Sequence, residues 1–290
     1  MSHFTVLVIG NYVDEALAPF NECEDVDRYV EYTKQQLIDK SKKEIEDYKN
    51  GRYAEYLADP EKYTSECNPQ QFQYITEEFP PRLSWTDDEH YADQIKWYEP
   101  EDIGPDGEVY STSNPNGYWD WYQIGGRWAG ALTVKPGTTF ESPNFSWGWS
   151  EEEKRRAMES LSTDSAFIKD IDFDVMNGDN LKNYKERYAL LQKWDELDME
   201  TRIGRFFWDT DQVEFVKSGK TLEEYLEEYM PHPLSAYAYI HEGEWHARWE
   251  MGWFAMSKND MGKKTWNQLF REFIEGLDPE TRVTFVDCHC

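Results

Sequence analysis

The stretch His3-Phe4-Thr5-Val6-Leu7-Val8-Ile9, closed by Gly10-Asn11, decides the fold of this chain. Its residues are almost all apolar or β-branched, which is typical of a strand buried on both faces of a sheet. A second run of this kind, Arg282-Val283-Thr284-Phe285-Val286, stands near the other end of the sequence. We therefore expect the two end segments to build one core.

Two further segments extend the predicted sheet. Tyr118-Trp119-Asp120-Trp121-Tyr122-Gln123-Ile124 alternates like a strand, and Gly125-Gly126-Arg127-Trp128 follows it. Paired glycines after a strand indicate a bend. Residues 236–249 predict a hairpin with its turn at His241-Glu242-Gly243-Glu244, and residues 265–277 have helical spacing.

These elements predict an α+β fold whose antiparallel-rich sheet is built from the two chain ends. The discontinuous core is expected from residues 1–22, 117–136 and 232–290, with large insertions at 23–116 and 137–231. The first insertion is interpreted as an acidic helical arm followed by an irregular segment. The second is mainly helical, with capping boxes that start at Ser150 and Thr221.

Charge limits the classes of partner. The chain has 30 Lys and Arg against 58 Asp and Glu, a net charge of −28. A surface this negative repels nucleic-acid backbones and anionic membranes, so neither is an expected partner. The charge suits a protein with a basic face, and an alternative is that it only keeps the chain soluble.

Location and redox state are also constrained. The segment Met1-Ser2-His3-Phe4 lacks the basic region of a signal peptide, and the sequence contains no run of 18 apolar residues. Four cysteines in 290 residues do not form a disulfide scaffold. A cytoplasmic protein is therefore expected.

Arg127 has two interpretations. It lies among aromatic residues, where an arginine usually stacks on the rings and pairs with a carboxylate such as Asp120. Its guanidinium could instead hold an anion, although Gly125-Gly126 lacks the glycine spacing of a phosphate-binding loop. The tryptophans of this region and of residues 252–256 are expected to be structural, packed in the core: Trp119, Trp121, Trp128 and Trp253.

The C-terminal Cys288-His289-Cys290 has three interpretations. The two cysteines could lie on the same face at the end of a strand. They could instead form a disulfide, or bind zinc with His3, His241 or His246. The C-x-C spacing is too short for the usual zinc knuckle, so no metal site is expected. The sequence also lacks the G-x-S-x-G and H-E-x-x-H patterns, and we expect no catalytic residue and no cofactor.

The motifs together resemble a family of bacteriophage proteins. The resemblance rests on the opening residues 3–10, on Leu17-Ala18-Pro19-Phe20, on the aromatic segment 119–128 and on the closing Val286-Asp287-Cys288-His289. It extends to Gly243-Glu244-Trp245-His246 and Met251-Gly252-Trp253-Phe254 and does not cover the two insertions.

In size and character the chain is most similar to the anti-defence proteins that phages direct against the bacterial Gabija system. The resemblance implies a non-enzymatic inhibitor in the cytoplasm of the infected cell, which forms oligomers around the Gabija complex and keeps its nuclease from binding or cutting DNA. It supplies no catalytic residue. The insertions would then contact the partner, and we single out Glu44, Glu46 and Asp47 as candidate binding residues.

Two other functions remain open at this point. The aromatic segment with Arg127 could bind a nucleotide or another small molecule, as an enzyme or as a protein that sequesters an immune signal. The carboxylates could also mimic the phosphates of DNA, in which case binding would weaken steeply with salt.

Overall fold

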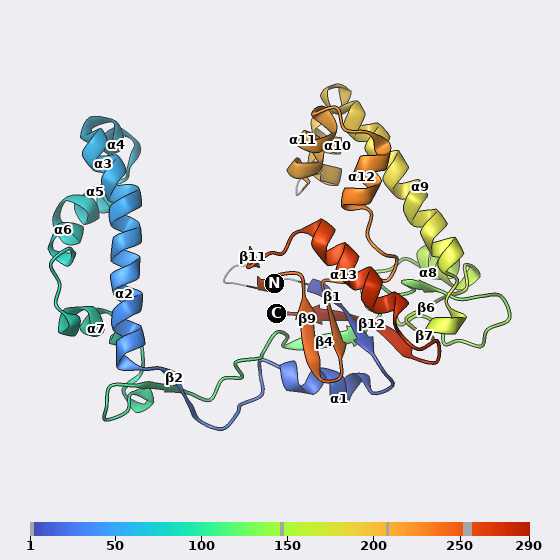
Figure 1. Ribbon diagram of the computed structural model, residues 1–290, viewed down its shortest axis with the longest axis horizontal. Helices are drawn as coiled ribbons and strands as arrows, with labels where there is room; N and C mark the ends of the chain where they lie inside the picture. The colour runs from blue at the N-terminus through green and yellow to red at the C-terminus, as the bar shows by residue number, and fades with distance from the viewer. Residues whose placement is uncertain (1–2, 146–147, 207–208, 252–256) are drawn as a thin grey trace. The chain divides into compact units, whose positions relative to one another are not determined.

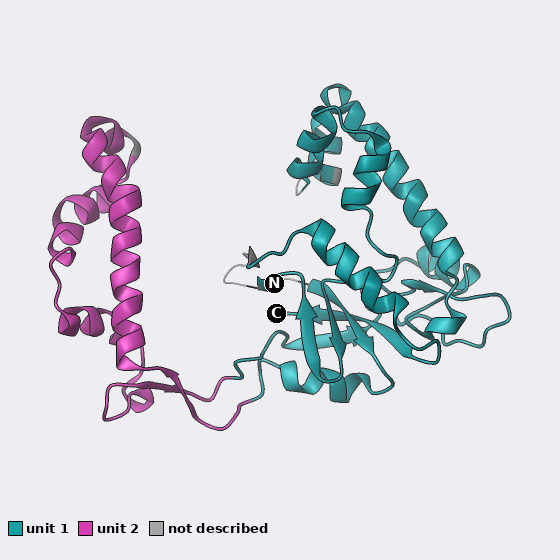
Figure 2. Cartoon of the chain, in the orientation of Figure 1, with its two compact units in different colours: residues 1–24, 114–290 teal, residues 25–113 magenta. Residues whose placement is uncertain are grey.

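The computed structural model describes residues 3–145, 148–206, 209–251 and 257–290. Figure 1 shows the helices and strands, and Figure 2 divides the chain into two compact units. Unit 1 contains residues 1–24 and 114–290, and unit 2 contains residues 25–113. The α+β class is confirmed, with a mostly antiparallel sheet to which both ends of the chain contribute.

The main sheet of unit 1 is organised around β1 (His3–Ile9), as expected for a strand buried on both faces. β1 pairs antiparallel with β12 (Arg282–His289) and parallel with β8 (Ala238–His241). The strand order is β4-β12-β1-β8-β9, and β7 also pairs with β12. The outer strands are β4 (Trp121–Ile124), β9 (Glu244–Ala247) and β7 (Ser165–Phe167). The predicted hairpin is the β8–β9 pair.

Two hydrophobic layers cover this sheet because side chains alternate along β1 and β12. On one face, α13 (Lys263–Glu275) packs Trp266 and Phe270 against Leu7 and Phe285. On the other face, α1 (Val13–Leu17) and the 3₁₀ turn η1 (Ala18–Phe20) pack against the even-numbered residues of β1. The core of unit 1 therefore lies on both sides of the strand pair that joins the two chain ends.

Residues 137–231 contain most of the remaining helices of unit 1. The capping boxes at Ser150 and Thr221 are confirmed, each with reciprocal bonds to the glutamate three residues later. The helices are α8 (Glu151–Glu159), α9 (Phe173–Gln192), α10 (Met199–Phe206), α11 (Thr210–Lys217) and α12 (Leu222–Tyr229), with 3₁₀ turns η5 (Ile168–Asp170) and η6 (Trp194–Glu196).

This segment also reaches the main core. Ala166 of β7 and Ile171 are buried in the same cluster as Phe270 of α13.

Short strands complete the local pairing: β5 (Leu132–Thr133) with β6 (Ser162–Thr163), and β10 (Glu250–Met251) with β11 (Ser257–Lys258). Strands of two or three residues are too short to produce a periodic pattern, so the sequence alone presents residues 137–231 as a separate insertion.

Unit 2 departs from its sequence-based description in two ways. The sequence pattern predicts a helix from Val26, but residues 29–32 form strand β2 (Tyr29–Tyr32), paired with β3 (Val109–Ser111), and the long helix α2 (Lys34–Tyr48) begins only after Thr33. The expectation that residues 60–117 are irregular is wrong for residues 60–102. Helices continue after α2 through the π-helical turn η2 (Lys49–Tyr53) and α3 (Ala54–Ala58). They are followed by α4 (Pro60–Glu66), α5 (Pro69–Gln73), the π-helical turn η3 (Tyr74–Glu78), α6 (Phe79–Arg82), α7 (Asp87–Ile95) and the 3₁₀ turn η4 (Pro100–Asp102).

Local signals explain these short helices. Asn68 and Thr86 form capping boxes, and a proline stands in the first turn of α4 and of α5. Helices of four to nine residues are too short for a visible apolar stripe, so their caps are the main evidence in the sequence. Fully buried Phe79 packs against Tyr48 and Tyr53 and forms a small core for unit 2. No helix among the described residues is long and apolar enough to cross a membrane.

Candidate histidine cleft

A cleft of about 880 Å³ opens in unit 1 where β1 begins and β12 ends. It lies on the sheet face that α13 covers further along, because its residues are odd-numbered on both strands. We call it the histidine cleft. It is lined by His3, Asp120, Trp121, Gln123, Arg127, Gly148, Trp149, Glu153, Asp287 and His289.

The first histidine of the cleft is held by a buried carboxylate. His3 Nδ1 lies 2.7 Å from Oδ1 of Asp287, whose residue is only 1% exposed. The other oxygen, Oδ2, accepts the backbone N–H of Arg127 at 3.0 Å. Because both oxygens of Asp287 have a donor, the carboxylate is tolerated in the interior and fixes the orientation of the His3 ring.

The second histidine is held in the same way. His289 Nδ1 lies 2.6 Å from Oδ1 of Asp120, just before β4. His3 and His289 face each other as register partners across β1 and β12, and their ring centroids are 5.1 Å apart. Two histidine–aspartate pairs therefore stand side by side at one end of the sheet.

Arg127 does not make the pair that the sequence suggested. Asp120 bonds to His289, and within the described residues the guanidinium of Arg127 has no ion pair, hydrogen bond or ring contact. The structural interpretation of Arg127 is thus wrong. The chain turns at Gly125 and Gly126, and the exposed Arg127 side chain lines the cleft instead.

The Gly125-Gly126 turn is shaped by two buried aspartates. Both glycines have positive φ, 73° and 58°. A Cβ on Gly125 would lie 2.3 Å from Oδ2 of Asp164, and a Cβ on Gly126 would lie 2.6 Å from Cβ of Asp287. Only glycine can occupy these positions without strain or collision. The turn therefore lets the backbone approach the carboxylate that orients His3.

The tryptophans of the aromatic segment have different surroundings. Trp119 is buried at 6% exposure and donates its indole N–H to the carbonyl of Leu17 at 3.1 Å, as expected for a structural residue. Trp121 is 49% exposed and lines the histidine cleft, so the expectation that it is packed in the core is wrong. Trp119 precedes β4, which begins at Trp121, so the two rings are not related by the alternation of one strand. Trp128 is partly buried, and Trp253 lies outside the described residues.

Trp149 supplies a second indole ring to the cleft. Its Nε1 donates to the carbonyl oxygen of Gly126 at 3.1 Å, and its ring packs against Phe145. The backbone of Gly126 therefore holds the Trp149 ring, and the same residue lies against Asp287, which orients His3. Trp149 was not singled out from the sequence, where it stands 22 positions away from Arg127.

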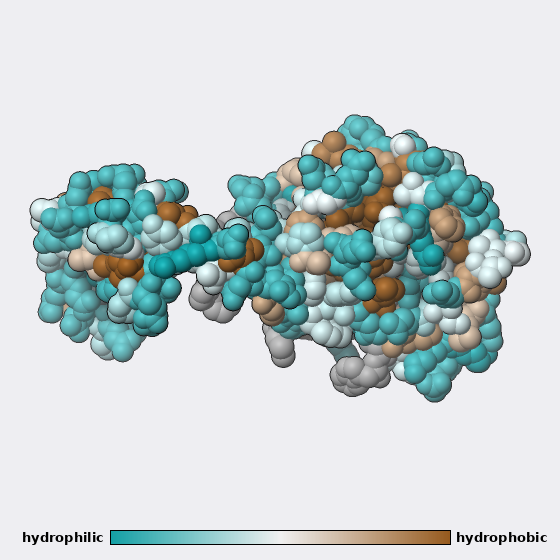
Figure 3. Space-filling view, turned by 90° about the horizontal axis from the view of Figure 1, so that it is seen from below, coloured by the Kyte–Doolittle hydropathy of each residue, from teal (hydrophilic) through white to brown (hydrophobic). Residues whose placement is uncertain are grey.

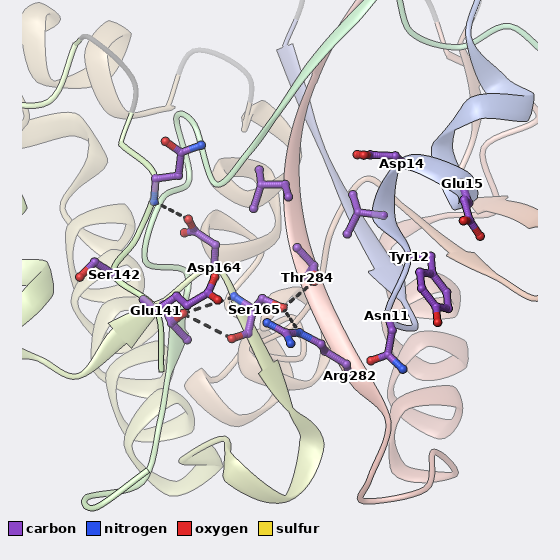
Figure 4. A pocket seen from close by; sticks show the side chains of 14 residues that line it. Asn11, Tyr12, Asp14, Glu15, Glu141, Ser142, Asp164, Ser165, Arg282 and Thr284 are labelled. Atoms are coloured by element: carbon purple, nitrogen blue, oxygen red, sulfur yellow. Dashed lines mark hydrogen bonds between the residues drawn. The ribbon is translucent and has the colours of Figure 1, made fainter. Parts of the chain in front are cut away.

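A second pocket, of about 550 Å³, lies on the opposite face of β12 (Figure 4). Arg282, Thr284, Asp164 and Ser165 line one side, and the Asn11–Glu15 segment lines the other. Its polar groups bond to one another: Arg282 Nε donates to Ser165 Oγ at 2.7 Å, and Ser165 Oγ lies 2.7 Å from Thr284 Oγ1. We therefore assign these contacts to the packing of β7 on β12.

The C-terminal cysteines lie away from the histidine cleft. Cys288 is fully buried in the cluster on the even-numbered face, where burial raises the pKa of its thiol well above the usual range. Cys290 is partly buried against the same cluster, and neither cysteine is part of a disulfide. His3 belongs to the other face, so it does not join them. Among the described residues, no group of three or more His, Cys, Asp or Glu is arranged to hold a metal ion.

The acidic residues proposed for partner binding lie on α2 of unit 2. Glu44, Glu46 and Asp47 are all exposed. Glu44 accepts a bond from Gln94 of α7 at 2.9 Å, and hydrogen bonds from Asn50 and Lys49 lower the pKa of Glu46. They are far along the chain from the cleft residues, and none of them lines the cleft.

Sequence reasoning did not assemble the histidine cleft. The sequence presents His3 only as a possible zinc ligand, and Asp120 only as a possible partner of Arg127. One signal was present, because Asp287 and His289 are two residues apart and so share a face of a strand. The register that brings His3 beside His289 depends on a pairing between residues 284 or more positions apart.

Comparison with protein-family models, with curated proteins and with solved structures finds no match to this chain.

Proposed function

We propose that this chain binds a small molecule that joins a planar ring system to a phosphate group, such as a nucleotide, in the histidine cleft. One observation carries the proposal. Within the described residues, the Arg127 guanidinium and the Nε2 atoms of His3 and His289 have no hydrogen-bond partner, yet they line one cleft.

The chemistry of the lining residues suits such a ligand. A guanidinium binds phosphate oxygens through paired N–H donors. The indoles of Trp121 and Trp149 offer stacking surfaces, and stacking of a base on an aromatic ring contributes about 1–3 kcal/mol. The volume of about 880 Å³ is that of a small-molecule site.

The charge of the chain favours a small ligand over a polynucleotide. Asp120, Glu153 and Asp287 line the cleft together with one arginine. With a net charge of −28, the surface repels an extended phosphate backbone, whereas a single phosphate group can be neutralised locally. A cyclic nucleotide, whose phosphate carries a single negative charge, is therefore the favoured ligand class.

Isothermal titration with a panel of nucleoside phosphates and cyclic nucleotides tests this proposal. We expect at least one to bind, Arg127→Ala to weaken binding by about tenfold or more, and Trp121→Ala to weaken it by about 5- to 150-fold from lost stacking. Arg52→Ala, which removes an exposed arginine of unit 2, is the matched control and should leave affinity unchanged. Absence of binding at millimolar ligand would refute the proposal.

A second candidate function concerns unit 2. The unit has 22 Asp and Glu against 10 Lys and Arg, and apolar side chains such as Leu57 and Trp97 are exposed by 60% and 77%. In the face drawn in Figure 3, its surface is mostly hydrophilic and is broken by small hydrophobic patches. Charge with scattered apolar anchors suits a protein partner that has a basic face.

The resemblance to phage anti-defence proteins identifies the Gabija complex as the partner to test. Mixed with that complex in size-exclusion chromatography, the chain should elute in a larger species, and the isolated chain should elute as a homo-oligomer. Reversing the charges of Glu44, Glu46 and Asp47 should weaken the complex without unfolding the protein. Independent elution at micromolar concentrations would exclude this function and leave the nucleotide proposal untouched.

A further inference from the structure

We propose that His3 and His289 form a general acid–base pair that hydrolyses a phosphodiester bond of the ligand in the histidine cleft, an inference that rests on the proposed function. The sequence contains no recognised catalytic motif. The pair exists only because β1 and β12 bring the two ends of the chain together in register.

Hydrogen bonding fixes the tautomer that each ring adopts when it is neutral. An ionised carboxylate can only accept, so the Nδ1 atoms that lie 2.7 Å from Asp287 and 2.6 Å from Asp120 must carry their protons. In each neutral ring, Nε2 is therefore left as the proton acceptor. Within the described residues neither Nε2 has a partner, so both are available to a ligand.

The spacing of the rings fits a reaction that needs both. The ring centroids are 5.1 Å apart in an edge-to-face arrangement, and both rings are partly exposed at the cleft wall. One ring can thus contact an attacking water molecule while the other contacts a leaving oxygen. Each ring lies against its own carboxylate, which stabilises the imidazolium when that ring gains a proton.

The proposed step is balanced without a cofactor. Neutral imidazole Nε2 of one histidine takes a proton from water as the water oxygen bonds to phosphorus. The imidazolium of the other gives its Nε2 proton to the ester oxygen as the phosphorus–oxygen bond breaks. One water is consumed, an alcohol and a phosphate monoester are formed, and exchange of protons with solvent restores the pair.

The charges in the cleft favour a diester over a monoester. One guanidinium, that of Arg127, faces the three carboxylates Asp120, Glu153 and Asp287. A phosphodiester carries a single negative charge, whereas a monoester dianion would need a second cation. Hydrolysis of a diester also expels an alkoxide. An alkoxide is a poor leaving group, of the kind that a general acid assists.

The test uses the full chain, free of tags, with cyclic nucleotides as probes and EDTA present throughout. Wild-type protein should release the monoester product. His3→Asn and His289→Asn keep a donor for the aspartate but remove Nε2. We expect each to lower kcat at least 100-fold with KM changed by less than about threefold. His246→Asn, on β9 outside the cleft, is the matched control and should retain full activity.

The outcomes separate this inference from the proposed function. If wild-type protein binds a cyclic nucleotide in calorimetry but releases no product, the acid–base pair is refuted and the binding function stands. If neither occurs, both fail. Activity that is lost in EDTA and restored by a divalent cation would show a metal site in place of the pair. If an Asn variant does not fold, judged by circular dichroism, the Gln variant at that position replaces it, and full activity there also overturns the proposal.

Asp120 and Asp287 are positioning residues in this scheme. Asp120→Asn presents an amide N–H or oxygen to His289 and so no longer selects one tautomer. We expect kcat to fall about tenfold or more while KM stays within about threefold, because the ring still lines the cleft. Asp120→Glu, which retains a carboxylate, should recover part of kcat. An unchanged kcat in Asp120→Asn would remove this role.

Discussion

Gly126 packs directly against the side chain of Asp287, so closely that a Cβ at position 126 would lie 2.6 Å from Cβ of Asp287. Asp287 in turn holds the backbone of Arg127 and the ring of His3. A glycine in a turn is thereby connected to the orientation of a histidine at the start of the chain. The first prediction follows from this contact.

Gly126→Ala should destabilise the protein and disturb the histidine cleft. The residue has a φ of 58°, which costs an alanine about 1–2 kcal/mol, and its methyl group must also displace the buried Asp287. Gly137→Ala is the matched control, because Gly137 has a φ of 90° but no atom within 4 Å of an added Cβ. Urea unfolding should show a larger loss for Gly126→Ala than for Gly137→Ala, by about 1 kcal/mol or more. Equal losses would mean that the collision with Asp287 is relieved at no cost.

The same region shows what sequence could predict. The apolar runs of β1 and β12 and the alternation of β4 identified the strands because buried strands need such patterns. The Gly125-Gly126 bend was also predicted correctly, since few other residues adopt positive φ. These signals are local to each segment, so they can be interpreted without knowledge of the fold.

The cleft could not be predicted because its contacts join distant segments. His3 meets His289 and Asp287 across the sheet, and Asp120 comes from the residue just before a third strand. Trp121 was assigned to the core because large aromatic rings are usually buried, whereas its position on β4 places it at the cleft. Strand register decides such cases, and register is a property of the assembled sheet.

Trp119 and Trp121 provide a second prediction, because they stand two residues apart with opposite roles. Trp119→Ala should lower the free energy of unfolding by about 3–5 kcal/mol, since the ring is buried and its indole N–H is bonded to Leu17. Trp121→Ala should change it by less than about 1 kcal/mol, since the ring is 49% exposed. Denaturant unfolding measures the stability of both variants, and nucleotide titration measures their affinity for the ligand. A large stability loss in Trp121→Ala would show that Trp121 is packed in the core.

His232 predicts how stability depends on pH. Its ring contacts those of Phe173 and Phe270, and burial lowers its pKa from 6.5 to about 4. As the pH falls from about 6.5 to about 4, His232 therefore becomes protonated in the unfolded chain but stays neutral in the folded chain. The stabilisation is fully present above 6.5 and is lost through that window, up to about 3 kcal/mol.

His232→Asn isolates this contribution. The His232 Nδ1 atom accepts the backbone N–H of Leu234 at 3.2 Å, and the amide oxygen of asparagine can replace that acceptor. Other groups titrate in both proteins, so the quantity to measure is the difference in unfolding free energy between wild type and variant at pH 7 and at pH 4.5. Wild type should lose more on acidification. Parallel pH curves would show that His232 is protonated with little cost in the folded state.

The last prediction concerns the independence of the two units. The chain leaves unit 1 and returns to it at neighbouring points, because Glu22 N–H bonds to the carbonyl of Trp119 at 2.8 Å and Asn21 forms a β-bridge with Trp119. Residues 25–113 form their own compact unit with a buried core at Phe79, Leu37 and Ile75.

Replacing residues 25–113 with a short Gly-Ser linker should therefore leave unit 1 folded. None of the residues lining the histidine cleft belongs to the deleted segment, so nucleotide affinity should stay within about threefold of the full chain. Binding of a protein partner through unit 2 should disappear. Thermal unfolding, calorimetry and size-exclusion chromatography measure the three effects. Loss of nucleotide binding in a folded deletion protein would place part of the ligand site in unit 2, whereas retained partner binding would place the protein interface in unit 1.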